Sequence, residues 1–291
     1  MYKYKIYGIG IHSDFKLYNL TETDVTPDAY IRRISDGFDR NAMAAANINY
    51  KLVPGGIWFM NDYGQFYVRD GKYIDILPIN ENDDFNLSSF ICGWCFAHLF
   101  AQRGYSAFHC TALKINNACV LISGESGSGK STTALELIKR GCKYLADDIA
   151  MITPDNDFMV YPAFPMQKMC RDVAEKYPSD EIFYVDTDKD KFAHENLNDF
   201  CTEPQPLKYI ILLDKQNIPA VKVKQVTGIN KFTDLINSLF LLESYDGPGM
   251  PAEERFRVLK TAEHVNILSI SRPSNIDTLV EICDIIEDFC K

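Results

Sequence analysis

The sequence lacks several features that would assign it to a membrane or to a nucleic-acid partner. No apolar run approaches the roughly 20 residues of a membrane span, and residues 1–7 hold no signal-peptide core. Basic residues do not dominate either, because 30 Lys and Arg stand against 40 Asp and Glu, for a net charge of −10. That balance argues against nucleic acid or an anionic membrane as the main partner. We therefore expect a soluble, cytoplasmic protein.

Cysteine patterns that would bind metal or exchange disulfides are also missing, although the chain has nine cysteines. Their number is odd and they are scattered, so reduced thiols are expected. Cys92 and Cys95 have C-x-x-C spacing, but no strand precedes them and no second ligand pair accompanies them. They lie in the apolar stretch 90–100, which predicts a buried helix, so a core role is favoured over a redox role.

The sequence does contain enough apolar material for a packed core, since 46% of its 291 residues are hydrophobic. Residues 1–84 predict a β-rich domain, because β-branched and aromatic runs are separated by turn signals such as Asp70-Gly71. The polar run 80–84 ends this region and supplies N-caps for a helix that begins near Phe85. We expect residues 1–84 to recognise substrate or mediate assembly, and residues 85–291 to form a second, α/β domain.

A glycine-rich loop carries the strongest chemical signal in the chain. It consists of Gly124, Glu125, Ser126, Gly127, Ser128, Gly129, Lys130, Ser131 and Thr132. These residues fit G-x-x-x-x-G-K-[ST], a pattern in which backbone N–H groups surround phosphate oxygens. The apolar run 118–123 predicts a strand entering the loop, and residues 132–140 predict a helix leaving it. The sequence thus predicts bound ATP, with Lys130 at the β- and γ-phosphates and Ser131 on Mg²⁺.

Two adjacent carboxylates, Asp147 and Asp148, follow a predicted strand at residues 143–146. Sheets of α/β proteins commonly place ligand groups at the carboxyl ends of their strands. Phosphoryl transfer to a hydroxyl needs Mg²⁺ at the phosphates and a carboxylate that accepts the hydroxyl proton. Neighbouring side chains that point in different directions can divide these two tasks. The alternative is a solvated acidic turn.

The residues from Gly124 to Asp148 resemble the core of the HPr kinase/phosphorylase-like family. The shared pattern is the loop G-[DE]-S-G-x-G-K-S, a helix T-A-L-E-L-x-K-R-G and a strand that ends in A-D-D, and His109 stands at the family's histidine position. The resemblance implies an α/β fold with a P-loop, a mixed sheet with helices like that of HPr kinase and PEP carboxykinase, and a small β-rich N-terminal domain. Some members of this group phosphorylate a serine of a precursor peptide in biosynthetic clusters.

The same resemblance implies roles for individual residues. Lys130, Asp147 and His109 would be catalytic, with Asp147 accepting the hydroxyl proton and His109 beside it. Ser131 and Asp148 would hold Mg²⁺. The alternative for His109 is a structural histidine on a half-buried strand.

Two departures from the family pattern narrow the expected activity. Thr132 stands where the enzymes that also dephosphorylate carry Glu, and no clear L-E-I-R-G-x-G segment follows, the nearest region being residues 161–171. The first departure favours a kinase that works in one direction, and the second argues against HPr itself as the substrate.

Basic residues near predicted strand ends and loops are candidate substrate or phosphate contacts, with a solvated surface charge as the alternative for each. They are Lys168, Arg171, Lys191 and Arg272.

The sequence favours an ATP- and Mg²⁺-dependent kinase that phosphorylates a serine of a peptide or small protein. Two alternatives stay open: a kinase for a small molecule such as free serine, and a nucleotide-binding regulatory protein without catalysis. Related kinases are often oligomeric, so a homo-oligomer is a further expectation from the resemblance.

Overall fold

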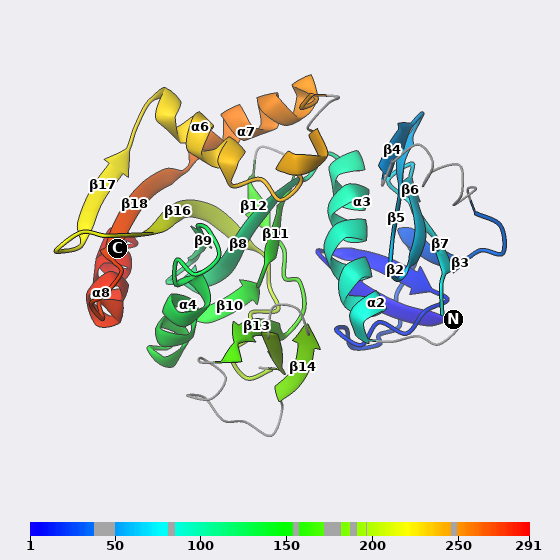
Figure 1. The fold of residues 1–291 in the computed structure, drawn as a ribbon, viewed down its shortest axis with the longest axis horizontal. Helices are drawn as coiled ribbons and strands as arrows, with labels where there is room; N and C mark the ends of the chain where they lie inside the picture. Colours follow the sequence, from blue (N-terminus) through cyan, green and yellow to red (C-terminus); the bar gives the residue numbers. More distant parts are fainter. Residues whose placement is uncertain are drawn as a thin grey trace. The chain divides into compact units, whose positions relative to one another are not determined.

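The structure is a computed structural model that describes residues 1–37, 50–80, 85–153, 157–171, 182–186, 191–195, 197–245 and 249–291. It divides into two compact units, Met1–Tyr105 and Ser106–Lys291, and Figure 1 labels most of their elements. Within the described ranges, no helix has the length and apolar content of a membrane span.

A seven-stranded sheet forms most of the first unit, with the strand order β1-β2-β3-β7-β6-β5-β4. The strands are β1 (Tyr2–Ile6), β2 (Ile9–Ser13), β3 (Ala29–Arg33), β4 (Tyr50–Val53), β5 (Gly56–Asn61), β6 (Gly64–Arg69) and β7 (Tyr73–Pro78). Successive side chains of a strand point to opposite faces, so Phe59, Phe66 and Ile74 are buried on one face while Tyr67 and Tyr73 are half-buried on the other. The predicted β-rich N-terminal region is confirmed.

A continuous helical segment completes the first unit. It comprises α2 (Phe85–Phe90), the π-helical turn η1 (Ile91–Cys95) and α3 (Phe96–Gln102). The ring centroid of Phe90 lies 4.8 Å from that of Phe66 in the sheet, so the segment packs on the apolar sheet face. The first compact unit thus extends to Tyr105. The sequence pattern predicts this boundary earlier, after residue 84.

The C-x-x-C pair belongs to the core of this helical segment. Cys92 and Cys95 are both buried, with 3% and 0% of their surfaces exposed. Burial raises the pKa of the Cys95 thiol well above its ordinary value. A buried thiol that resists ionisation is unsuited to disulfide exchange, which agrees with the predicted core role.

The second unit is built on a mixed sheet with the order β10-β8-β11-β12-β16-β18-β17, in which β9 pairs with both β8 and β16. The strands are β8 (Ser106–Ile115), β9 (Ala118–Ser123), β10 (Lys143–Ala146), β11 (Ile149–Ile152), β12 (Met159–Val160), β16 (Gln205–Gln216), β17 (Lys222–Val226) and β18 (Asn266–Pro273). β16 runs parallel to β9 and β18, whereas the other pairs are antiparallel. The predicted mixed α/β fold is confirmed.

Helices and a small second sheet flank this mixed sheet (Figure 1). The helices are α4 (Lys130–Lys139), α6 (Ile229–Asn237), the 3₁₀ turn η2 (Leu242–Tyr245), α7 (Ala252–His264) and α8 (Leu279–Phe289), and the small sheet has the order β13 (Met166–Cys170), β15 (Lys191–Glu195), β14 (Ile182–Asp186). Apolar side chains of α4 and α8, such as Leu137 and Ile286, share one buried cluster with Ile122 of β9 and Ile270 of β18. This core fixes α4 against the strands that precede its loop.

The parallel strands place three distant segments at one sheet edge. Ser123, the last residue of β9, and Ser269 of β18 both lie opposite Leu212 of β16. The glycine-rich loop leaves β9 at this carboxyl edge, where α/β sheets commonly bind ligands. Arg272 follows three residues after Ser269 and so reaches the same edge.

Candidate active site

The glycine-rich loop joins β9 to α4 in a strand–loop–helix arrangement. Gly124, Gly127 and Gly129 have φ angles of 151°, 82° and 110°, which favour glycine over other residues. A Cβ atom at Gly124 would lie 2.1 Å from the carbonyl oxygen of Leu213, so the close approach of β16 also requires glycine there. Strand, loop and helix together give the architecture that the motif predicts.

The lysine of the motif begins α4 and folds back over the loop. Lys130 Nζ donates hydrogen bonds to the carbonyl oxygens of Gly124 at 2.5 Å and Glu125 at 3.1 Å. Ser131 and Thr132 follow in the first turn and are half-buried. The helix N-terminus adds a partial positive charge beside the lysine, so this part of the unit is suited to an anion.

A buried hydroxyl inside the loop fits a phosphate ligand. Ser128 is 3% exposed, and its Oγ has no hydrogen-bond partner among the described residues. A buried hydroxyl without a partner is costly, whereas a bound phosphate oxygen would accept a hydrogen bond from it. Glu125, Ser126 and Gly127, in contrast, are exposed.

The carboxylate pair forms the turn between β10 and β11. The Thr111 hydroxyl donates to Asp147 Oδ1 at 2.7 Å, and the Lys168 backbone N–H donates to Asp147 Oδ2 at 2.7 Å. Burial, assisted by the charge of Asp148, raises the pKa of Asp147 above its ordinary value, and the bonds from Thr111 and Lys168 counter part of this shift. Asp147 is therefore a more basic carboxylate than an ordinary aspartate.

His109 contacts Asp148, although the sequence predicted that it would lie beside Asp147. Its Nδ1 is 3.1 Å from the Asp148 carbonyl oxygen and 3.5 Å from Asp148 Oδ1. The register explains the difference, because His109 on β8 lies opposite Ile149 and therefore next to Asp148, which precedes it. Burial is the main cause that lowers the pKa of His109; the Asp148 charge counters part of this shift and the charge of Lys130 adds to it, so the neutral imidazole is favoured.

The backbone of the carboxylate turn is strained at Asp148. Its φ angle is 72°, in the left-handed region that non-glycine residues seldom adopt. The carboxylate carried on this strained residue reaches both His109 and Lys168, whose Nζ lies 2.9 Å from Asp148 Oδ2. Backbone strain of this kind clusters at functional sites.

Two of the predicted basic contacts reach the site. Lys168 meets both carboxylates, and Arg272 donates from Nε to the Ser128 carbonyl oxygen at 2.6 Å and from Nη2 to that of Gly127 at 3.3 Å. Arg171 is exposed and lies 5.2 Å from the ring centroid of Phe192 on the small sheet. The backbone of Lys191 pairs with Cys170, but its side chain lies outside the described part of the chain.

Thr111 is a site residue that the sequence reasoning missed. A detectable signal existed, because Thr111 lies two residues after His109 on the same strand and therefore on the same face. β8 also pairs with β9 next to the loop, where Cys110 lies opposite Ser123 and the Ser123 hydroxyl donates to the His109 carbonyl oxygen at 2.9 Å. These bonds connect the carboxylate turn to the start of the glycine-rich loop.

The residues at this edge fit Mg²⁺ as a metal. The described residues contain no cluster of three or more His, Cys, Asp or Glu side chains that could hold a metal by themselves. Mg²⁺ is usually held by one or two protein oxygens together with phosphates and water. The hydroxyl of Ser131 and the carboxylate of Asp148 are oxygen donors of the required kind.

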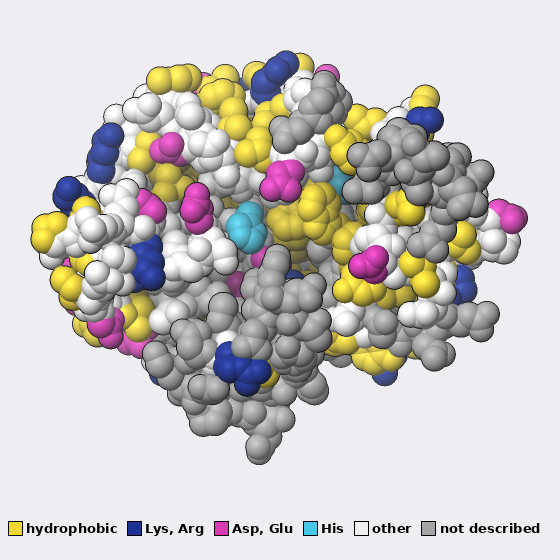
Figure 2. All heavy atoms as spheres, in the orientation of Figure 1, with side chains coloured by type: hydrophobic (Ala, Val, Ile, Leu, Met, Phe, Trp, Pro, Cys, Tyr) yellow, Lys and Arg dark blue, Asp and Glu magenta, His cyan; other side chains and the backbone are white. Residues whose placement is uncertain are grey.

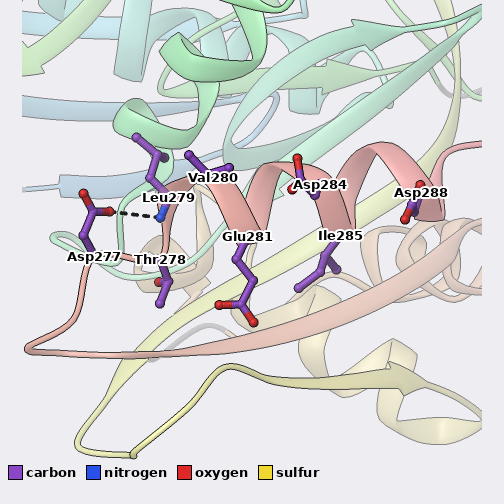
Figure 3. A pocket seen from close by; sticks show the side chains of 8 residues that line it. All are labelled: Asp277, Thr278, Leu279, Val280, Glu281, Asp284, Ile285 and Asp288. Carbon is purple, nitrogen blue, oxygen red and sulfur yellow. Dashed lines mark hydrogen bonds between the residues drawn. The ribbon is translucent and has the colours of Figure 1, made fainter.

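A separate groove runs along α8 in the same unit (Figure 3). Its volume is about 610 Å³, and it is lined by Asp277, Thr278, Leu279, Val280, Glu281, Asp284, Ile285 and Asp288. This acidic lining disfavours phosphates. The face shown in Figure 2 has Lys and Arg side chains dispersed among acidic and apolar ones, which fits the acidic composition.

The mixed sheet, the glycine-rich loop and the carboxylate turn belong to one α/β unit, and comparisons with known proteins show what part of it is similar to. Residues 100–169 match the family model "HPr Serine kinase C-terminal domain". Relatives named HPr kinase/phosphorylase from Bacillus cereus (strain B4264) and Bacillus anthracis (strain A0248) are 43% identical over 60 residues, which cover 21% of this chain and 19% of each relative. Over this segment the chain is similar to HPr kinases, and the predicted resemblance is confirmed.

The extent of these similarities is limited. The chain spans about a fifth of the length of the curated relatives it matches. A solved structure titled HPr(Ser) kinase/phosphatase from Coxiella burnetii is similar with a TM-score of 0.34 and 17% identity, covering 63% of this chain and 95% of that one.

Proposed function

We propose that this chain is an ATP-dependent kinase that transfers the γ-phosphate to a hydroxyl, with a serine of a peptide or small protein as the favoured acceptor. The observation that carries the proposal is the raised pKa of the Asp147 carboxylate. Thr111 binds this carboxylate, and Thr111 lies on β8, the strand that pairs with β9 just before the glycine-rich loop. A general base near a phosphate site is the arrangement that phosphoryl transfer requires. A precursor peptide of a biosynthetic cluster is one acceptor of this class.

Each site residue has a proposed task. Gly124 to Ser131 surround the triphosphate, and the Lys130 ammonium turns from the loop carbonyls to the β- and γ-phosphates. Asp147 takes the proton from the acceptor hydroxyl. The neutral His109 fixes the position of Asp148. Ser131 and Asp148 would hold Mg²⁺, which supplies charge neutralisation at the phosphates when bound.

Two further features complete the proposal. Thr132 on α4 offers no carboxylate beside Ser131, which supports transfer in one direction. The first unit, with its own sheet and core, is proposed to recognise the acceptor or to mediate assembly.

A product analysis tests the proposal. The chain is incubated with ATP, Mg²⁺ and two pools, one of serine-containing peptides and one of small hydroxyl metabolites, and products are identified by mass spectrometry. We expect a phosphoryl group on a peptide serine, and none with Lys130→Ala. A phosphoryl group only on a small molecule would reject the peptide acceptor, and tight ATP binding without transfer to any component of a cell lysate would reject catalysis.

A further inference from the structure

Lys168 binds both members of the carboxylate pair, one through its backbone and the other through its side chain. Its N–H donates to Asp147 Oδ2 at 2.7 Å, and its Nζ contacts Asp148 Oδ2 at 2.9 Å. Lys168 lies on β13 of the small sheet, 20 residues after Asp148 in the sequence. The small sheet therefore supplies a positive charge that faces the carboxylate turn.

The surroundings of Asp148 make this ammonium its close counter-ion. On the other side, Asp148 Oδ1 faces His109 Nδ1 at 3.5 Å, and Thr111 and Asp147 bind each other beside it. The Lys168 and Asp148 side chains are 27% and 29% exposed. The pair is partly shielded, which strengthens its attraction, but solvent and ligands can still reach it.

We propose that the Lys168 ammonium occupies the position on Asp148 that a divalent cation takes when nucleotide binds. This inference rests on the proposed function, in which Asp148 is a metal ligand. A divalent cation on Asp148 Oδ2 and an ammonium 2.9 Å from the same atom repel each other strongly. The ammonium must therefore leave when the metal arrives.

The geometry also gives the displaced side chain a destination. The backbone of Lys168 stays tied to Asp147 through its N–H, while the four-carbon stem of lysine is flexible. The ammonium thus turns about a fixed backbone and remains within the site, where phosphate oxygens are the negative groups that arrive with the metal. Lys168 suppresses binding of free metal and favours metal that is delivered with nucleotide.

Binding of Mn²⁺ to the nucleotide-free protein tests this inference without relying on activity. Electron paramagnetic resonance of unbound Mn²⁺ gives the affinity for the full chain. We expect Lys168→Met to bind Mn²⁺ roughly tenfold more tightly than the wild type, because a cation beside the ligand carboxylate is removed. Lys168→Arg keeps the charge and should bind as weakly as the wild type. With ATP present, Lys168→Met should bind Mn²⁺ normally but turn over more slowly.

A matched control is available in the same unit. Lys143 Nζ lies 2.9 Å from Asp199 Oδ1, so Lys143→Met removes a lysine–aspartate pair of equal length away from the carboxylate turn. It should leave Mn²⁺ affinity unchanged. Lys168→Gln serves in place of Lys168→Met if the latter melts early.

Equal Mn²⁺ affinities of the wild type and Lys168→Met would overturn the inference while leaving the kinase proposal in place. A different result would remove both the proposed function and this inference: the wild type binds ATP, but ATP brings no additional Mn²⁺ to the protein and no phosphate is transferred.

Discussion

The glycine-rich loop and the carboxylate turn lie near one sheet edge, but they are built in different ways. The loop uses backbone groups, shaped by the positive φ angles of Gly124, Gly127 and Gly129. The turn uses side chains, and Asp147 depends on donors from two other strands, Thr111 on β8 and Lys168 on β13. The comparison teaches that a contiguous segment can set its own backbone geometry, whereas a carboxylate of raised pKa needs partners from the folded unit.

The two regions also differ in how they accept backbone strain. The loop has glycine at its left-handed positions, so its conformation costs little. The turn has an aspartate at φ 72°, which costs on the order of 1 kcal/mol or more. Backbone strain therefore occurs at Asp148, where glycine would relieve it but would also remove the carboxylate.

Asp147→Asn should have the largest effect, and only on turnover. The amide cannot accept the hydroxyl proton, so kcat should fall by about 10³-fold, while ATP affinity, a property of the loop, changes little. The Lys168 N–H can still donate to the amide oxygen, and the Thr111 hydroxyl can accept from the amide nitrogen. Transfer of labelled phosphate and ATP titration measure the two quantities.

Thermal unfolding of the same variant gives a second readout. The pKa of Asp147 is raised in the folded state, so its stabilising contribution is present below the unfolded pKa and lost as pH rises through the folded pKa. Its ionised form thus costs stability at pH 7, and Asp147→Asn should melt no lower than the wild type. Asp284→Asn on α8, 61% exposed, is the control and should leave kcat unchanged. Full turnover by Asp147→Asn contradicts the assignment.

Gly124→Ala should damage the loop and nucleotide binding together. The new Cβ would lie 2.1 Å from the Leu213 carbonyl oxygen, so β16 or the loop must shift, at a cost of about 2–3 kcal/mol in unfolding free energy. ATP affinity should fall at least about tenfold, which corresponds to 1.4 kcal/mol. Denaturant unfolding and calorimetric titration measure these changes.

Gly127→Ala is the matched control for this variant. Its φ is 82°, but no atom lies within 4 Å of the new Cβ. Only backbone strain remains, about 1–2 kcal/mol. If the two variants lose equal stability, the contact with Leu213 does not explain the need for glycine at position 124.

The same contrast explains how far the sequence could predict the structure. The loop, its strand and its helix were predicted, because the motif is contiguous and its backbone geometry is local. The partner of His109 was not predicted correctly, because it depends on the pairing of β8 with β11, which brings Asp148 instead of Asp147 next to the imidazole.

Other misses have the same physical origin. Thr111 reaches Asp147 only because β8 lies beside the turn. The hydrogen bond from Lys168 to Asp147 likewise depends on where β13 of the small sheet is placed. The boundary after Tyr105 reflects packing of Phe90 on Phe66, two residues that are far apart in the sequence. Contacts of this range are absent from local sequence patterns.

Thr111→Val should move the pH dependence of turnover. Asp147 must be ionised to accept a proton, so kcat falls as pH decreases through its pKa, which lies above the ordinary aspartate value. The Thr111 hydrogen bond lowers that pKa, and its loss should shift the acidic limb of kcat upward by about one pH unit. Thr261→Val removes a comparable buried hydroxyl from α7 and should leave the limb in place. If the acidic limb of kcat is not shifted in Thr111→Val, that limb reports the titration of a group other than Asp147.

The smallest expected effect is the stability difference between two substitutions of Asp148, and it isolates the strain in the turn. Asp148→Gly and Asp148→Ala both remove the carboxylate, and with it the contacts to His109 and Lys168. They differ only in whether a Cβ must be carried at a φ of 72°. The glycine variant should therefore be more stable than the alanine variant by about 1 kcal/mol, as measured by denaturant unfolding. Equal stabilities would mean that the turn relaxes once the carboxylate is gone. In that case the contacts to His109 and Lys168, and not the turn itself, hold Asp148 in its left-handed conformation.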